Sequence, residues 1–205
     1  MQAFQTLELL RQARVLATVR EPDTDHAFRA ACACLEAGMS CIEVSMAVPF
    51  ACDVMESLAR QPGVLVGAGG VLDAPAAALA LQSGARFVRS PGVVPEVLAL
   101  AARHGAVGIA GAWTPGEVLT ALNAGADVIS VLSTGPAALA HLEALSWTYP
   151  QALFLPELTQ FPDDVQRWMQ PQVLALALGG RRTLGTQDGD CEQVGRRALA
   201  ARRAA

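Results

Sequence analysis

The chain has 205 residues, of which 52% are hydrophobic and only 17% are charged, so it carries enough apolar side chain for one large core. This length predicts a single domain over residues 1–205. The formal net charge is −4 and the arginines are scattered, which argues against a nucleic-acid partner.

Cysteine usage and the apolar runs bear on the compartment. The five cysteines are odd in number and lack metal-ligand spacing, so we expect free thiols in a reducing cytosol. No charged segment followed by an apolar one opens the chain, and the apolar runs are too short to cross a membrane. We therefore expect a cytoplasmic protein with no membrane partner.

A repeated unit runs along the chain: an amphipathic stretch, a glycine, and then a short apolar run. The glycines of this unit are separated by 25, 21, 21 and 20 residues, and they are Gly38, Gly63, Gly84, Gly105 and Gly125. A glycine just past a helix provides a left-handed cap, and an apolar run of four to seven residues suits a buried parallel strand. A period near 20 residues fits one strand and one helix.

The elements can be taken in chain order. A helix is predicted at 3–11, before the first strand. Eight strands are predicted at 15–19, 41–46, 65–70, 87–91, 107–112, 128–132, 152–156 and 173–178. Each is followed by a helix-start signal such as Thr114-Pro115 or the segment 161–164. Acids at the start and arginines at the end of 188–205 indicate a solvated terminal helix. The fold class predicted is α/β, a single (β/α)8 TIM-type barrel with an extra N-terminal helix; an open doubly wound sheet is the alternative.

In such barrels the functional site lies at the carboxyl ends of the strands. The residues at those ends include Arg20, Glu43, Arg89, Ser130 and Glu157. Arg20 is either an anion-binding residue or a surface cap. Arg89 is either the partner of Glu43 or Glu157, or a solvated residue at a strand end. A carboxylate inside a barrel is costly unless it is paired, so Glu43 calls for a partner.

Six segments stand in order along roughly residues 14–185: VR (19–20), IEVSMAVP (42–49), VGAGGV (66–71), GARFVRSPG (84–92), GAWTPGEV (111–118) and GAD (125–127). Together they resemble the 2-keto-3-deoxy-6-phosphogluconate and 4-hydroxy-2-oxoglutarate aldolases. This resemblance implies a lyase that cleaves a 2-keto sugar acid to pyruvate and an aldehyde. A lysine on strand six of these aldolases forms an imine with the substrate, a glutamate on strand two, here Glu43, shuttles protons, and glycine-rich turns hold a phosphate.

This chain departs from that pattern at the site. Ser130 stands where the lysine is expected, and the chain contains no lysine at all. Ala47 replaces an arginine and Gly70 replaces a threonine. Residues 110–111 replace a Pro-Gly pair, residues 156–159 replace Pro-Thr-Gly-Gly, and the loop after strand six is shortened. Glu157 would repel a phosphate at close range. Serine cannot form an imine, so the family chemistry is lost, altered or moved to another mechanism.

The candidate site residues follow from these observations. The catalytic candidates are Glu43, as proton shuttle by resemblance, and Ser130, at the position of the lysine. The substrate-binding candidates are Arg20, Arg89, Ser90, Pro91, Glu157, Gly179, Gly180 and Arg181. Trp113 either stacks on a ligand or packs under a loop. His26, His104 and His141 are expected on helices, away from the strand ends.

Three functions remain open at this point. The first is an enzyme acting on a 2-keto acid or sugar acid without an imine, with Glu43 and Glu157 as a base pair or as metal ligands. The second is a non-catalytic barrel that binds a small anionic 2-keto acid or sugar acid through arginines. The third is a barrel of structural value only. No cofactor and no metal site are predicted, because no histidine is placed to complete one. The resemblance implies a homo-oligomer, a trimer.

Overall fold

The computed structural model describes residues 2–133, 137–160, 165–182 and 191–204, and it is a closed barrel of eight parallel strands in the order β1 to β8. The strands are β1 (Val15–Val19), β2 (Cys41–Ser45), β3 (Leu65–Gly69), β4 (Phe87–Ser90), β5 (Val107–Gly111), β6 (Val128–Ser133), β7 (Phe154–Gln160) and β8 (Leu176–Arg182). β8 pairs with β1 and closes the barrel. The predicted fold class is confirmed, and the open-sheet alternative is wrong.

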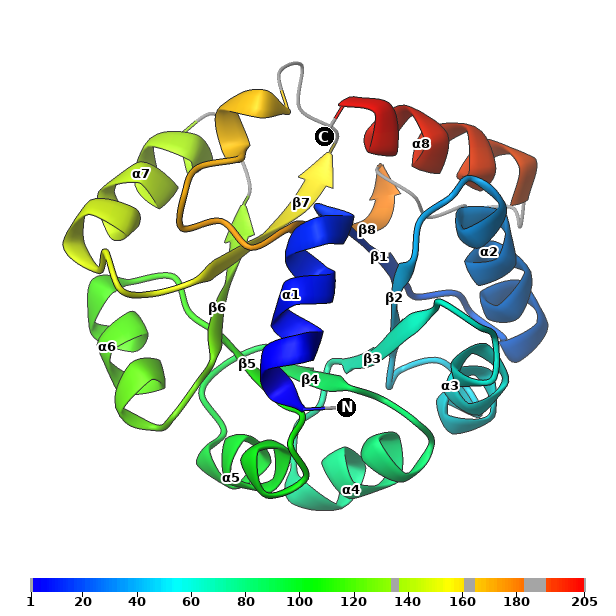
Figure 1. Cartoon of the computed structure of the whole chain (residues 1–205), viewed down its shortest axis with the longest axis horizontal. Coiled ribbons are helices and arrows are strands. Elements are labelled where there is room, and N and C mark those ends of the chain that lie inside the picture. Colours follow the sequence, from blue (N-terminus) through cyan, green and yellow to red (C-terminus); the bar gives the residue numbers. More distant parts are fainter. Residues whose placement is uncertain (1, 134–136, 161–164, 183–190, 205) are drawn as a thin grey trace.

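Helices surround the barrel as an outer ring (Figure 1). They are α2 (Thr24–Glu36), α3 (Ala51–Ala59), α4 (Ala74–Gln82), α5 (Pro95–Arg103), α6 (Pro115–Asn123), α7 (Ala138–Thr148) and α8 (Cys191–Ala204). Local sequence accounts for their starts: Asp23 and Asp73 cap α2 and α4, and Thr114 and Glu117 form a capping box on α6. No helix in the described part of the chain is long and apolar enough to span a membrane.

The additional N-terminal helix, α1 (Ala3–Ala13), crosses one end of the barrel (Figure 1). Its Leu10 is fully buried and belongs to the apolar cluster that fills the barrel interior at the end covered by α1. Leu16, Phe87 and Leu155 belong to the same cluster. The larger apolar cluster lies between strands and outer helices. The barrel is thus sealed at this end, and its polar interior lies at the other.

Strands β7 and β8 begin and end later than predicted. Val173, Leu174 and Ala175 are buried as expected, but they form only a single bridge to Phe154, and the ladder with β1 begins at Leu176. The apolar pattern reports burial, whereas a strand is defined by its hydrogen-bonded neighbour. Both strands continue as far as the pair Gln160–Arg182, so Gly179 and Gly180 belong to β8 and not to a turn after it.

The structure also differs from the prediction of a helix after the seventh strand. Its proposed start, residues 161–164, lies outside the described residues. The described part of that connection contains only a short 3-10 helix, η1 (Gln166–Trp168). Val165, just before η1, is buried against the outer core, so the described part of this connection packs onto the barrel.

Candidate functional site

Alternation along parallel strands brings the predicted residues together at the carboxyl ends. Side chains at every second position of a barrel strand point inward. Thr18 and Arg20 share one face of β1 and its end, Glu43 and Ser45 share one face of β2, and Ser130 and Leu132 share one face of β6. These faces line a cavity of about 770 Å³ at the barrel mouth.

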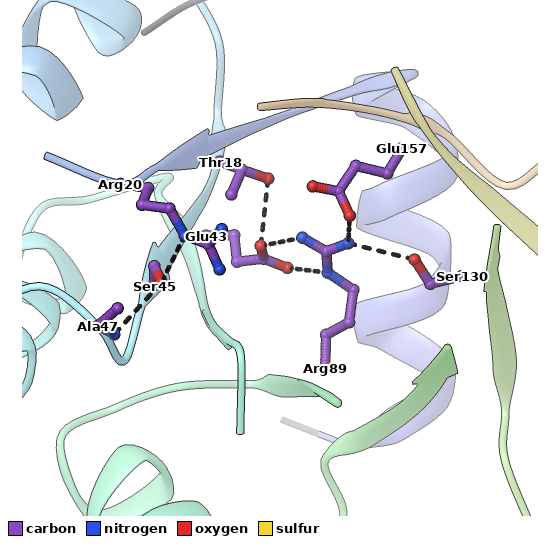
Figure 2. Close-up of polar contacts among 8 residues, drawn as sticks. All are labelled: Thr18, Arg20, Glu43, Ser45, Ala47, Arg89, Ser130 and Glu157. Atoms are coloured by element: carbon purple, nitrogen blue, oxygen red, sulfur yellow. Dashed lines mark hydrogen bonds and ion pairs between the residues drawn. The ribbon is translucent and has the colours of Figure 1, made fainter. Parts of the chain in front are cut away.

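Arg89 of β4 lines this cavity, and its guanidinium contacts side chains from three other strands, β2, β6 and β7 (Figure 2). Its Nε donates to Glu43 Oε2 at 2.7 Å and its Nη2 to Glu43 Oε1 at 2.5 Å, which is a bidentate pair. Its Nη1 donates to Glu157 Oε2 at 2.5 Å and to Ser130 Oγ at 3.2 Å. The solvated alternative for Arg89 is therefore wrong: it is the partner of both glutamates.

Two of the three charges of this cluster, Glu43 and Arg89, are almost fully removed from water, whereas Glu157 is partly exposed. Glu43 is completely buried, and Thr18 Oγ1 donates a further hydrogen bond to its Oε1 at 3.1 Å. Burial alone would lower the pKa of Arg89, but the neighbouring carboxylates of Glu43 and Glu157 outweigh it and raise that pKa. The guanidinium is therefore a permanent cation. The three charged groups together carry −1.

A glycine makes room for the buried carboxylate. A Cβ at Gly69 of β3 would lie 2.3 Å from Glu43 Oε1, closer than any side chain tolerates. Only glycine at this position allows Glu43 to reach Arg89. The second glycine of the GAG segment is therefore explained by the ion cluster beside it, whereas the first, Gly67, leaves room for the ring of Phe87, 2.2 Å from where its Cβ would lie.

Arg20 is the second cation of the cavity. It follows β1 and is exposed, and its Nε donates to Ser45 Oγ at 3.3 Å (Figure 2). In the described part of the chain it forms no ion pair with a carboxylate. Gly70 next to it adopts a positive φ of 69°, and a Cβ there would still be 3.8 Å from Arg20 Nη2. The Arg20 guanidinium thus borders open space.

The remaining predicted residues occupy the rim. Ser90, Pro91 and Gly179 line the cavity, and the buried Ser90 Oγ has no hydrogen-bond partner among the described residues. Gly180 and Arg181 lie on β8, but their side-chain environment is outside the described residues. All other predicted site residues lie in or around one cavity.

One contact at the cavity mouth, on the side opposite Arg20, could not be predicted from the sequence. Trp113, after β5, stacks on His141 of α7 with ring centroids 4.2 Å apart, and His141 Nε2 lies 2.6 Å from the Trp113 carbonyl oxygen. The expectation that His141 lies away from the strand ends is wrong. Its place depends on how α7 packs after β6, and no local pattern encodes that packing.

The arrangement leaves little room for a metal ion on the glutamates. Both Glu43 oxygens and one Glu157 oxygen are hydrogen-bonded to Arg89, so an ion bound there would have to displace a guanidinium. Within the described residues, no group of three or more His, Cys, Asp or Glu side chains could hold a metal. The chemistry that these residues do offer is recognition of an anion by Arg20, beside an interior cluster whose one cation is already paired.

Fold and site together define an α/β-barrel protein with a polar small-molecule cavity at the carboxyl ends of its strands. The family model for KDPG and KHG aldolase matches residues 7–196. This chain belongs to that family.

Three similar proteins illustrate the relationship. A 2-dehydro-3-deoxy-phosphogluconate aldolase of Treponema pallidum is 32% identical over 196 residues, which cover 91% of each chain. A solved 4-hydroxy-2-oxoglutarate/2-dehydro-3-deoxyphosphogluconate aldolase from TTHB1 is 29% identical, with a TM-score of 0.81 over 97% of this chain and 98% of that one. A KDPG aldolase of Legionella pneumophila, solved with pyruvate as a covalent carbinolamine, is 22% identical, with a TM-score of 0.76 over 96% and 98%.

Proposed function

We propose that this barrel binds a small anionic 2-keto acid or sugar acid without forming an imine. The observation that carries the proposal is the Arg89 guanidinium, which lies against Ser130 and is held by Glu43 and Glu157. By resemblance, Ser130 stands at the position of the imine-forming lysine. The centre of the site therefore holds a cation that cannot act as a nucleophile.

The side chains support binding without covalent chemistry. An imine requires a neutral primary amine, and the chain contains no lysine. An arginine stays protonated in proteins and donates hydrogen bonds only. The α-amine of the first residue is the one primary amine in the sequence.

Glu43 is poorly suited to the proton-shuttling role that the resemblance implies. Both of its oxygens accept hydrogen bonds from Arg89, and the side chain is fully buried. To accept a proton from a substrate, it would have to give up a buried ion pair, which costs several kcal/mol. We assign Glu43 and Arg89 to the architecture of the site and Arg20 to the ligand carboxylate.

Calorimetric titration with pyruvate tests the binding. Arg20→Ala should weaken pyruvate binding at least about 10-fold, because a charge-assisted bidentate contact is worth 1.5 kcal/mol or more. Arg60→Ala is the matched control, since Arg60 pairs with Glu56 on the exposed face of α3 and its end. Equal affinities of the two variants would assign the carboxylate elsewhere.

Borohydride reduction in the presence of pyruvate tests the absence of an imine. We expect no adduct within the chain when the intact mass and its fragments are measured. An adduct mapped to an internal residue would refute the proposal.

A second candidate is a lyase or enolising enzyme that works without an imine. The observation that favours it is Glu157, whose side chain is 27% exposed and lines the cavity. As a general base it would exchange the methyl protons of pyruvate with solvent deuterium. Exchange that is abolished by Glu157→Gln would establish this candidate in place of simple binding.

We further propose a cytoplasmic homotrimer, by resemblance. Large apolar side chains on the outer surface are compatible with a buried interface, and they include Phe4, Phe50, Leu79 and Leu119. Light scattering should give about three times the chain mass of 21.4 kDa. A monomer at micromolar concentration would contradict the assembly.

A further inference from the structure

The cavity has two chemically different sides. Arg20 and Ser45 come from β1 and β2, whereas Trp113 and Leu132 come from β5 and β6. In a closed barrel of eight strands in sequential order, β1 faces β5 and β2 faces β6. A ligand whose carboxylate is held at Arg20 therefore extends over the Arg89 cluster toward Trp113 and Leu132.

The far side presents two large apolar side chains to the cavity. Trp113 is 40% exposed and Leu132 is 52% exposed. Leu132 follows Ser130 by two residues on β6, so it occupies the inward-facing register of that strand. Exposed apolar side chains that line a cavity lower the free energy of binding when a ligand covers them.

Trp113 is held in place by groups other than a hydrophobic core. Glu117 accepts hydrogen bonds from the backbone N–H of Trp113 at 2.9 Å and of Thr114 at 2.8 Å. These bonds lower the pKa of Glu117, which keeps the anchoring carboxylate ionised. His141 stacks against the indole and contacts the Trp113 carbonyl. An aromatic side chain fixed before binding loses little entropy when a ligand stacks on it.

The charges on this side are unfavourable for a phosphate. Glu117 of α6 and Glu157 of β7, the register neighbour of Leu132, line the cavity on this side, and among its described lining residues the cations are Arg20 and Arg89. Arg89 is already neutralised by two glutamates. A dianionic group placed here would meet carboxylates and no available cation in the described part of the chain.

We infer that the cavity selects a 2-keto acid or 2-hydroxy acid whose distal end is uncharged and apolar, with an aromatic ring as the best fit. This inference rests on the proposed function, because it requires the ligand carboxylate at Arg20. Trp113 is then a specificity-determining residue, and His141 and Glu117 are positioning residues that act through it.

The test compares pyruvate, phenylpyruvate, 2-oxoglutarate and 6-phosphogluconate by calorimetric titration of the full chain. We expect phenylpyruvate to bind on the order of 10-fold more tightly than pyruvate, because it adds a stacked ring and its buried area. The other two acids, which carry a second charged group, should bind no better than pyruvate. Trp113→Ala should remove the preference for phenylpyruvate and leave the affinity for pyruvate within about 2-fold.

Trp147→Ala is the matched control, because Trp147 is 89% exposed on α7 and does not line the cavity. It should keep the full preference. His141→Ala should reduce the preference partly, with a smaller change in pyruvate affinity, since it frees the indole without removing it. Loss of phenylpyruvate binding in Arg20→Ala would show that the ring does not bind on its own.

The outcomes separate the two claims. If none of the four acids binds, the proposed function fails. If pyruvate binds and phenylpyruvate gains nothing, or if its gain survives Trp113→Ala, the inference is wrong while the proposed function stands. Tighter binding of 6-phosphogluconate than of phenylpyruvate would also overturn the inference, and it would point to a phosphate-binding group elsewhere at the mouth.

Discussion

At the scale of single residues, Arg89 decides what the site can do. It satisfies a completely buried carboxylate, and it also reaches a second carboxylate and the hydroxyl of Ser130. A buried ion pair contributes little relative to a hydrophobic replacement of the whole pair, but removal of one partner leaves an unpaired buried charge. Removal of one charged partner should therefore lower the stability of the chain more than replacement of both partners by apolar residues.

Arg89→Ala should lower the free energy of unfolding by about 3–5 kcal/mol, because Glu43 would remain buried without its cation. Denaturant unfolding measures the change. Arg60→Ala, which breaks the exposed pair with Glu56, should cost no more than about 0.5 kcal/mol. Similar losses in the two variants would mean that Glu43 is not held as the structure indicates.

A lysine cannot simply be restored at position 130. Ser130→Lys would place an ammonium group against Arg89 Nη1, which is now 3.2 Å from the serine hydroxyl, and should destabilise the chain by about 2–4 kcal/mol. The double variant Ser130→Lys/Arg89→Leu exchanges one cation for another beside the same two glutamates. We expect it to be more stable than Ser130→Lys alone and, at alkaline pH where part of the lysine is a neutral amine, to be trapped by pyruvate and borohydride.

The control for that experiment is Arg89→Leu alone, which offers no amine and should give no adduct. If the double variant folds and also fails to form an adduct at position 130, the resemblance that places the imine-forming group there is misaligned. Mass mapping of the reduced peptide distinguishes the two cases.

Two buried thiols should account for most of the change in the free energy of unfolding at alkaline pH. Burial raises the pKa of Cys34 and of Cys41 to about 12 from the ordinary 9.0. Between pH 9 and 12 the unfolded chain loses these protons while the folded chain retains them, so stability falls as the pH rises, by about 1.4 kcal/mol per pH unit for each thiol. Because the chain has no lysine and one tyrosine, few other groups titrate in that range.

Denaturant unfolding at pH 8 to 11 measures this slope. Cys34→Ala should reduce it, and so should Cys41→Ala. An unchanged slope in Cys34→Ala would show that its thiol is reached by water.

At the scale of elements, α1 closes the end of the barrel opposite the site. Leu10 projects into the interior cluster, while its neighbour Leu9 is exposed. Leu10→Ala should cost about 2–5 kcal/mol of unfolding free energy through lost burial and a residual cavity, and Leu9→Ala less than about 0.5 kcal/mol. Thermal unfolding of the matched pair checks this. Equal effects would mean that α1 does not seal the barrel.

Helix and strand bounds can be predicted from the sequence where a residue type has a single structural cause. The glycines that end helices gave reliable boundaries, and Gly38, Gly84 and Gly125 all adopt positive φ. The predicted starts of β7 and β8 are too early because Ala152 and residues 173–175 are apolar and buried, and Leu153 is apolar and partly buried, but all of them lie outside the ladder. Burial can be read from composition, but strand pairing depends on a distant partner.

At the scale of the whole molecule, the order of strands in the closed barrel explains why part of the site could be predicted from the sequence. Once eight parallel strands are recognised, Glu43, Arg89 and Glu157 must converge, because inward positions of a barrel share one interior. The Trp113–His141 contact could not be predicted in this way. It joins a loop to a helix that the sequence does not position, so it required the folded structure.

We propose that the mouth binds a carboxylate at Arg20 without covalent chemistry and without opening the Arg89 cluster. A crystal structure of the chain soaked in pyruvate tests this most directly. We expect a separate pyruvate molecule with its carboxylate on Arg20 and with the Arg89–Glu43 and Arg89–Glu157 contacts intact. Continuous density from pyruvate to a protein atom, or pyruvate bound to a guanidinium of Arg89 that has left Glu43, would contradict it.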